Sequence, residues 1–387
     1  MPSLIRAHAA STDAMLEAFG DAALLRAALR FEAGLARARA DLGLLDPVSA
    51  KAIEAACAEP PEIEPLAAAA AHAGTLAIPL VALLRARIPD AAIAAELHKG
   101  ATSQDLADTV LVLQAKAGMA LIRHEGHRLR QALATLTEAH LATPMLGRTL
   151  LQPALPITFG LKTAQWLAGI DDALARSEAE AERALRIQLG GATGSLADLD
   201  GQGLAVSDRL AEILGLAPAL APWHARREAL AGLASALAIL VGAIGKIARD
   251  LSLLAQAEVA EAFEPRVTGR GGSSAMAHKR NPTACQTALS AALRAPHLAA
   301  TLVSALPQAH ERDLGGWQAE GPVLAELFAL THGALAAMAP AIEGLEVRAD
   351  RMADNLATAN LGLDTGESET IARRILDHYR SSPHGLR

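Results

Sequence analysis

Residues Leu230 to Leu254 read LAGLASALAILVGAIGKIARDLSLL, and this stretch decides the fold class of the chain. Its apolar residues recur at alternating spacings of three and four, the pattern of a helix that buries one face against other helices. No proline occurs between Pro222 and Pro265, so one helix of about 40 residues and about 60 Å is possible. Such a length favours a long helical bundle that several subunits can share.

The composition also favours helices over sheets. Of the 387 residues, 51% are apolar and only 2% are aromatic, so the core must consist of Ala, Leu, Ile and Val side chains that let helices approach closely. Two further proline-free stretches, Ala91 to Thr143 and Ile157 to Ala217, carry helical patterning. The chain shows no sustained strand-type alternation and no internal repeat. We predict an all-α protein.

Charge and cysteine content limit the partners of the chain. A net charge of -7 leaves no broad basic field for nucleic acid. The two cysteines, Cys57 and Cys285, provide neither a disulfide framework nor a metal-ligand cluster, which indicates a reducing, cytoplasmic setting. The uncharged stretch Ala229–Gly245 is shorter than the roughly 20 apolar residues that span a bilayer. We interpret it as a buried bundle helix and expect no membrane partner.

The most informative polar stretch is Gly269 to Pro282, GRGGSSAMAHKRNP. Glycines followed by serines can present hydroxyl and backbone N–H groups to an anion, while Lys279 and Asn281 add a charge and an amide. The alternative is a glycine-rich linker into a helix that Pro282 starts at its first turn.

Within this stretch, residues 272–282 resemble the signature loop of the fumarase/aspartase superfamily and depart from it at Ala277, where the family usually has proline. The resemblance implies that Ser273 exchanges a proton with the carbon next to a substrate carboxylate. It also implies that Lys279 and Asn281 hold that carboxylate. The other members of the loop that we expect to contact substrate are Ser274, Met276 and His278.

A second matching segment, HKGATSQDLADT, runs from His98 to Thr109 and resembles the first conserved region of the superfamily. Taken alone, its Thr-Ser-Gln-Asp is an ordinary helix N-cap. We interpret Asp105 and Asp108 as capping, solvated residues rather than catalysts. The resemblance implies that the segment binds a substrate carboxylate through His98, Thr102, Ser103 and Gln104.

A third segment, Gly147 to Pro153 (GRTLLQP), has the framework of adenylosuccinate and argininosuccinate lyases. Leu150 replaces their functional histidine, and Gln286 stands where its glutamate partner is expected. An amine leaving group benefits from an acid that protonates it, whereas a carboxylate leaving group does not. The double replacement therefore favours the cycloisomerase branch of the superfamily. From this segment we expect substrate contacts by Arg148, Thr149 and Gln152.

Arg312 lies in a segment, His310 to Glu320, that also resembles the cycloisomerase branch, as do Leu151–Lys162 and Gln188–Ala197. Its planar guanidinium is suited to clamp a substrate carboxylate. A surface ion pair with Glu311 or Asp313 is an equally good interpretation.

Several histidines lie outside these motifs. None has a partner at ligand spacing, so we expect each on the surface or at an interface. They are His8, His72, His124, His127, His140, His224, His297 and His332.

The resemblance implies a homotetramer with a shared central bundle and active sites built from several subunits. It implies lactonisation of the tricarboxylate 3-carboxy-cis,cis-muconate, without metal or organic cofactor. The rivals are another superfamily lyase, acting on a succinylated amine, and a non-catalytic helical assembly protein. We predict an N-terminal helical domain over residues 1–105, a long-helix domain over 106–345 and a shortened C-terminal domain over 346–387.

Overall fold

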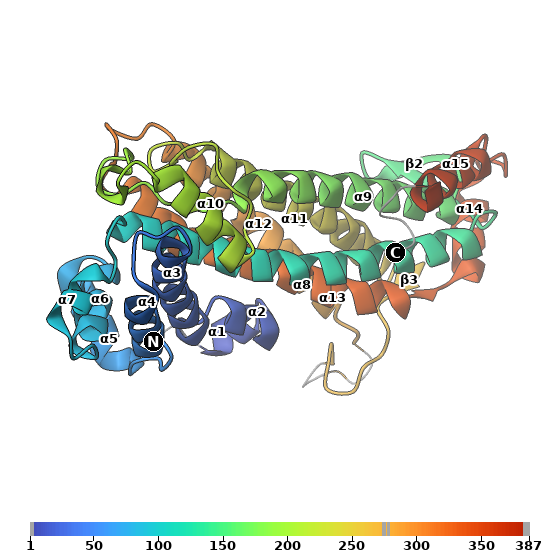
Figure 1. Cartoon of the computed structure of the whole chain (residues 1–387). Coiled ribbons are helices and arrows are strands. Elements are labelled where there is room, and N and C mark those ends of the chain that lie inside the picture. The colour runs from blue at the N-terminus through green and yellow to red at the C-terminus, as the bar shows by residue number, and fades with distance from the viewer. Residues whose placement is uncertain (1–3, 273–275, 277–278, 382–387) are drawn as a thin grey trace.

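The computed structural model of the chain describes residues 4–272, 276 and 279–381. Five long helices form a bundle that runs the length of the molecule (Figure 1). Each of them packs against at least two of the others, which confirms the all-α prediction. These helices are α8 (Ser103–Ala139), α9 (Phe159–Ala184), α11 (Glu228–Leu254), α12 (Thr283–Ser304) and α13 (Gly316–Glu343).

Seven shorter helices lie along the half of the bundle in which α8 begins, and we call the end of that half the Thr102 end (Figure 1). Among them, α3 packs on α8 and on α10 (Gly203–Leu214), which lies at the same end. The 3-10 helix η1 (Ala197–Leu199) precedes α10. The seven are α1 (Leu4–His8), α2 (Asp13–Ala18), α3 (Asp21–Asp41), α4 (Pro47–Ala56), α5 (Ile63–Ala73), α6 (Ala77–Ala86) and α7 (Ala91–Glu96).

The opposite end carries short strands that the sequence did not predict, and we call it the hairpin end. There β1 (Pro144–Thr149) pairs antiparallel with β2 (Gln152–Thr158), and β3 (Ala262–Phe263) pairs with β4 (Glu346–Val347). The last helices, α14 (Ala349–Ala359) and α15 (Ser368–Ser381), lie at this end as well (Figure 1). Helix α15 packs on α8 and α9, burying Ala372, Leu376 and Tyr379.

The direction of each long helix follows from the contacts at its ends. The residue before α11, Arg227, bonds Asp108 near the start of α8, so α8 and α11 both begin at the Thr102 end. Glu320, in the second turn of α13, bonds the same arginine. Helices α9 and α12 therefore run the other way, from the hairpin end back to the Thr102 end.

Helix α11 confirms the heptad pattern but is shorter than the sequence allowed. All eight Leu and Ile residues of its three-and-four pattern are buried. The helix ends at Leu254 instead of continuing toward Pro265. Beyond it, Ala260 adopts a left-handed φ of 53°, and the Glu261 carbonyl accepts the Arg348 N–H at 2.9 Å. The chain thus turns out of the helix to form β3.

Two of the long helices, α11 and α13, are long and apolar enough to cross a membrane. In each, 61% of the most apolar window is buried inside the bundle, which is the environment of a core helix. The interpretation of Ala229–Gly245 as a buried bundle helix is confirmed. Close packing depends on small residues, since a Cβ at Gly126 of α8 would lie 2.6 Å from the Leu174 side chain of α9.

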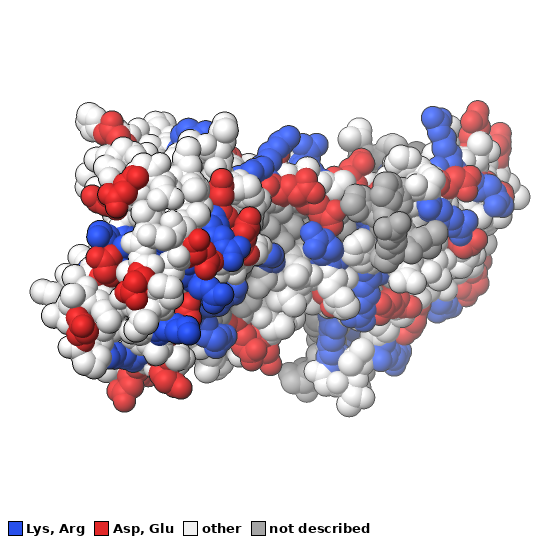
Figure 2. Space-filling view, viewed as in Figure 1, with Lys and Arg blue, Asp and Glu red and all other residues white. Residues whose placement is uncertain are grey.

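Acidic and basic side chains are interspersed over the face of the molecule that Figure 2 shows. This mixture agrees with the net charge of -7. On this face no broad basic field is available to hold a polyanion.

Candidate active site

The first conserved segment places its polar residues at the start of α8. Thr102 is the N-cap residue, and its backbone N–H donates to Asp105 Oδ2 at 2.8 Å in a capping box. Thr102 and Ser103 are both half-buried. A helix N-terminus presents N–H groups and a positive dipole end, which favour an anion. This arrangement suits the carboxylate-binding role predicted for Thr102 and Ser103.

The carboxylates of this segment are buried, so the prediction that they are solvated was wrong. Asp105 does cap α8 as predicted, but its exposed fraction is 0% and that of Asp108 is 2%. Asp105 accepts hydrogen bonds from the Gly190 and Gly191 backbone N–H groups, each at 2.9 Å. A buried carboxylate persists only with such partners. Asp105 and Asp108 therefore stabilise the site as buried residues.

Arg312 joins the start of α8 to the glycine-rich segment after α9. Its Nη1 donates to Thr102 Oγ1 and, at 3.3 Å, to the Ala192 carbonyl. No ion pair links it to Glu311 or Asp313, both of which are described residues, so the surface-pair interpretation was wrong. A half-buried guanidinium beside a helix N-terminus is positioned to bind a carboxylate.

The two remaining predicted residues of this segment have partners inside the protein. Gln104 is 0% exposed, and its Nε2 donates to Asp108 at 3.2 Å and to the His224 carbonyl at 3.0 Å. His98 Nδ1 lies 2.7 Å from Glu32 Oε1. Burial lowers the pKa of His98, but the hydrogen bond and charge of Glu32 raise it by more, so it stands above its ordinary value.

Two histidines that we expected on the surface or at an interface are buried inside the chain. His224 is 3% exposed and His332 is 4% exposed. His224 Nε2 lies 2.6 Å from Asp105 Oδ1, and His332 Nδ1 lies 3.1 Å from Thr12 Oγ1. Sequence spacing could not reveal either pair, because the partners are 119 and 320 residues apart.

A buried ionic cluster lies next to Gln104 and was not predicted. Arg227 is 1% exposed, donates to both Asp108 oxygens at 2.8 Å and also bonds Glu320. Burial raises the pKa of Glu320 more than Arg227 lowers it. The cluster joins α8, the start of α11 and α13. The one feature of the sequence that could have indicated this cluster is Arg227 itself, a cation directly before a long apolar helix.

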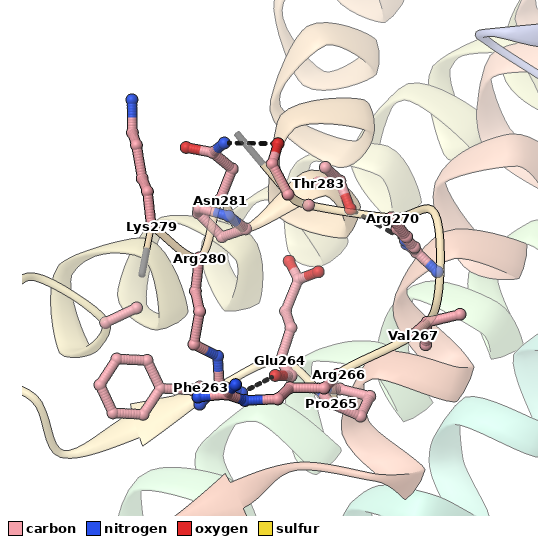
Figure 3. A pocket seen from close by; sticks show the side chains of 14 residues that line it. Phe263, Glu264, Pro265, Arg266, Val267, Arg270, Lys279, Arg280, Asn281 and Thr283 are labelled. Atoms are coloured by element: carbon pink, nitrogen blue, oxygen red, sulfur yellow. Dashed lines mark hydrogen bonds between the residues drawn. The ribbon is translucent and has the colours of Figure 1, made fainter. Parts of the chain in front are cut away.

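The described ends of the signature loop, Gly272 and Lys279 to Pro282, lie at the hairpin end and line a cavity of about 190 Å³. Lys279 and Asn281 line this cavity, and Lys279 extends away from Glu264 (Figure 3). Asn281 Nδ2 donates to the Gly272 carbonyl at 3.4 Å, and Met276 is 43% exposed. The other predicted residues of the loop lie outside the described residues; they are Ser273, Ser274 and His278.

Glu264 ties the base of the loop to α12. Its carboxylate accepts the Ala284 and Cys285 N–H groups at 3.0 and 2.9 Å, so it caps the helix that follows the loop. Arg280 bonds the Glu346 carboxylate and the Glu264 carbonyl. The Lys279 ammonium forms no hydrogen bond or ion pair with the described residues, so it remains available to a ligand.

The third conserved segment forms the β1–β2 hairpin. Arg148 donates to both Glu261 oxygens, at 2.8 and 2.9 Å, and Glu261 is 0% exposed. This pair fixes the hairpin to the body of the molecule. At the tip, Leu150 and Leu151 are 96% and 74% exposed. Thr149 and Gln152, which flank them, are also exposed.

The predicted site residues that the structure describes lie in two groups that do not meet within one chain. Helix α12 has 22 residues, so it places about 33 Å between the loop before it and Arg312 beyond its end. Helix α8 has 37 residues, which gives about 55 Å between Thr102 and the turn that leads to the hairpin. Lys279 and Arg148 lie at the hairpin end, and Thr102 and Arg312 at the other.

The described part of the chain also limits metal chemistry. Within residues 4–272, 276 and 279–381, no group of three or more His, Cys, Asp or Glu side chains could hold a metal ion. Both cysteines are buried and free.

Comparison with known proteins places these features in context. A family model described as "Lyase" matches residues 7–296. A 3-carboxy-cis,cis-muconate cycloisomerase of Bradyrhizobium diazoefficiens is 47% identical over 365 residues, covering 94% of this chain and 81% of that protein. A nitrosuccinate lyase of Streptomyces davaonensis is 43% identical over 370 residues, covering 92% of this chain and 76% of the relative.

Solved structures show the same likeness. The 3-carboxy-cis,cis-muconate lactonizing enzyme of Pseudomonas putida superposes with a TM-score of 0.87 at 40% identity, covering 97% of this chain and 87% of that one. A fumarate lyase of Mesorhizobium superposes with a TM-score of 0.83 at 34% identity, covering 95% and 86% of the two chains.

Proposed function

This chain belongs to the lyase family of the fumarase/aspartase superfamily, and from that premise we propose that it closes 3-carboxy-cis,cis-muconate to 4-carboxymuconolactone. The observation that carries the proposal is Leu150. It stands at the hairpin tip in the place of the histidine that related lyases use, and leucine cannot protonate an amine leaving group. The similarity to cycloisomerases over more than nine tenths of the chain points the same way.

The reaction sets clear demands on the site. One carboxylate oxygen of the substrate adds to a carbon of the conjugated diene, and a C–O bond forms. The π electrons move toward a neighbouring carboxyl group, which takes on the charge of an aci-carboxylate. A proton then adds to the adjacent carbon. One carboxylate becomes a neutral lactone, so the conversion of trianion to dianion consumes one proton.

The residues of this chain can meet these demands without a redox group, because the substrate and the lactone are isomers. Lys279 and Asn281 stabilise the charge that develops on the carboxyl group, and Ser273 delivers the proton. Arg312 and Thr102 hold a second carboxylate. The enzyme is therefore cofactor-independent, and we expect full activity after treatment with a strong chelator. The setting that fits this catabolic reaction, a step of protocatechuate breakdown, is the cytoplasm.

A complete site on this proposal combines several chains in a homotetramer. The distance of about 33 Å along α12 separates Lys279 from Arg312 within one subunit. A substrate with three carboxylates is too small to reach both. The exposed hairpin tip, with Leu150 and Leu151, is suited to enter a neighbouring subunit and bury its apolar surface there.

A second candidate is β-elimination from another succinate derivative. The nitrosuccinate lyase at 43% identity favours it, because nitrite is, like a carboxylate, a stable anion that needs no acid to leave. Adenylosuccinate and argininosuccinate are poorer candidates, since Gln286 cannot replace the glutamate that pairs with the missing histidine.

The decisive assay is incubation of the purified protein with 3-carboxy-cis,cis-muconate while the loss of diene absorbance is followed. Ser273→Ala serves as the control and should lose at least about a hundredfold in kcat. Parallel incubations with nitrosuccinate, adenylosuccinate and argininosuccinate test the rivals. Faster turnover of any of these, or turnover unchanged by Ser273→Ala, contradicts the proposal.

A further inference from the structure

Asp105 is the point where three separate segments of the chain meet. One carboxylate oxygen accepts the Gly190 N–H, and the other accepts the Gly191 and Thr102 N–H groups. His224, from the segment before α11, lies 2.6 Å from the first oxygen. Four donors thus converge on one buried carboxylate, which is 0% exposed.

The local chain is shaped to admit the His224 ring. A Cβ on Gly190 would lie 2.6 Å from His224 Cε1, so only glycine leaves room for the imidazole at this position. The His224 carbonyl accepts Gln104 Nε2 at 3.0 Å, which holds its backbone as well. Ring and backbone are therefore both fixed against the first turn of α8.

The substrate-facing groups depend on this arrangement. Arg312 bonds Thr102 Oγ1 and the Ala192 carbonyl, and these acceptors lie on two different segments. Asp105 binds the backbone of both segments, at Thr102 on one side and at Gly190 and Gly191 on the other. The Asp105 carboxylate therefore fixes the distance between Thr102 and Ala192, the two residues that the Arg312 guanidinium bridges.

We infer that Asp105 and His224 are positioning residues for the carboxylate cradle formed by Thr102 and Arg312. Neither is exposed enough to touch substrate, so they act through the cradle. A misplacement of about 1 Å in such a group costs up to a hundredfold in rate or binding. This inference rests on the proposed function for its kinetic test, and a binding test checks it separately.

Two variants of His224 separate a positioning role from a merely structural one. In His224→Gln the side-chain amide nitrogen can take the place of Nε2 and still donate to Asp105. In His224→Asn the amide is shorter and takes the place of Nδ1, so Asp105 loses this donor. Both substitutions keep a polar side chain that fits the same space.

We expect His224→Asn to raise KM for 3-carboxy-cis,cis-muconate roughly tenfold or more, with kcat within about threefold of the original. His224→Gln should stay within about threefold in both constants. The matched control is Asp171→Asn, which removes the ion pair between the half-buried Asp171 and the buried Arg130 without touching the cradle. It should lower the melting temperature and leave KM unchanged.

Calorimetric binding of tricarballylate, a saturated tricarboxylate, tests the cradle without turnover. We expect His224→Asn to weaken this binding roughly tenfold and His224→Gln to preserve it. If the original protein binds tricarballylate and the two His224 variants differ as expected, but the muconate is not turned over, the proposed function fails and this inference stands. Equal behaviour of the two His224 variants, or an equal rise of KM in Asp171→Asn, overturns the inference.

Discussion

Arg312 reaches from the segment after α12 to two acceptors that belong to different parts of the chain. A lysine at this position carries the same charge but has a single nitrogen at the end of a flexible stem. It could not keep Thr102 and Ala192 bridged and still bind a carboxylate in a fixed plane. The guanidinium geometry is therefore as important as the charge.

We predict that Arg312→Lys raises KM for the tricarboxylate by roughly tenfold to a hundredfold, because a bidentate contact worth about 1.5–3 kcal/mol is lost. Steady-state kinetics measure the effect. Arg183→Lys, in an exposed pair with Glu180, is the control and should leave KM unchanged. A KM for Arg312→Lys equal to that of the control would show that Arg312 does not contact substrate.

His98 makes stability depend on pH. The carboxylate of Glu32 holds the pKa of His98 above its ordinary value of 6.5 in the folded protein, although burial opposes this shift. The charged pair is therefore fully stabilising below pH 6.5, and its contribution is lost as the pH rises through the folded-state pKa. We predict that His98→Gln lowers the melting temperature most below pH 6.5 and least well above it.

Melting curves across this pH range check the prediction, with the exposed His297→Gln as control. A melting-temperature difference between the original protein and His98→Gln that stays constant with pH would disprove a role of the charged His98–Glu32 pair.

Where a motif existed, the sequence selected residues that lie together in the fold, while their role in binding substrate stays a prediction. Thr102 and Arg312 were chosen from motifs, and they contact each other in the fold. His224 and Arg227 were missed because a buried ion pair needs partners from distant segments, which only the folded chain brings together.

At the scale of elements, the β1–β2 hairpin combines exposure with an unusual backbone. Leu150 and Leu151 form its two-residue loop, and both have left-handed φ angles, 51° and 64°. Two positive φ angles define a type I′ turn, which strongly prefers Asn-Gly. Leucine is disfavoured there on its own, which supports the proposal that the hairpin tip contacts a second subunit.

We therefore predict that the double variant Leu150→Asn/Leu151→Gly folds as well as the original chain but assembles poorly. Burial of each leucine in a partner contributes about 1.5–3 kcal/mol, and the variant loses it in every subunit. Light scattering after gel filtration should show smaller species, and activity should fall in parallel. Val48→Thr, at an exposed position of α4, is the control. An intact, active tetramer in the double variant would refute the role of the tip.

Helices α8, α9 and α11 were predictable because each lies in a proline-free stretch with helical apolar patterning. The β1–β2 hairpin could not be predicted from the sequence. Pairing in β1 is irregular between Leu146 and Arg148, and β2 contains Pro153 and Pro156, so neither strand shows a clean alternation. Helix α11 did not reach the possible 40 residues, because the chain turns after Leu254 and then forms β3, which pairs with β4.

At the scale of the whole molecule, the Arg227 cluster connects three long helices through buried charges. We predict that Arg227→Met destabilises the fold by about 3–5 kcal/mol, because it leaves Asp108 and Glu320 buried without a countercharge. Denaturant unfolding measures the change. The triple variant Arg227→Met/Asp108→Asn/Glu320→Gln removes the stranded charges and should recover most of the loss. If it recovers none, packing rather than charge explains the effect.

Helix α12 has Lys279 ahead of its first residue and Arg312 beyond its last. In a closed assembly of four chains, every such helix then serves two reaction centres, supplying the charge-stabilising lysine to one and the clamping arginine to another. Defects at its two ends should therefore complement each other. Hybrids refolded from inactive Lys279→Met and Arg312→Met chains should regain up to about a quarter of the original turnover. This activity would come from the centres that receive an intact lysine and an intact arginine. In the homotetramer that we propose, each subunit would therefore contribute to two neighbouring reaction centres and would hold no complete centre of its own.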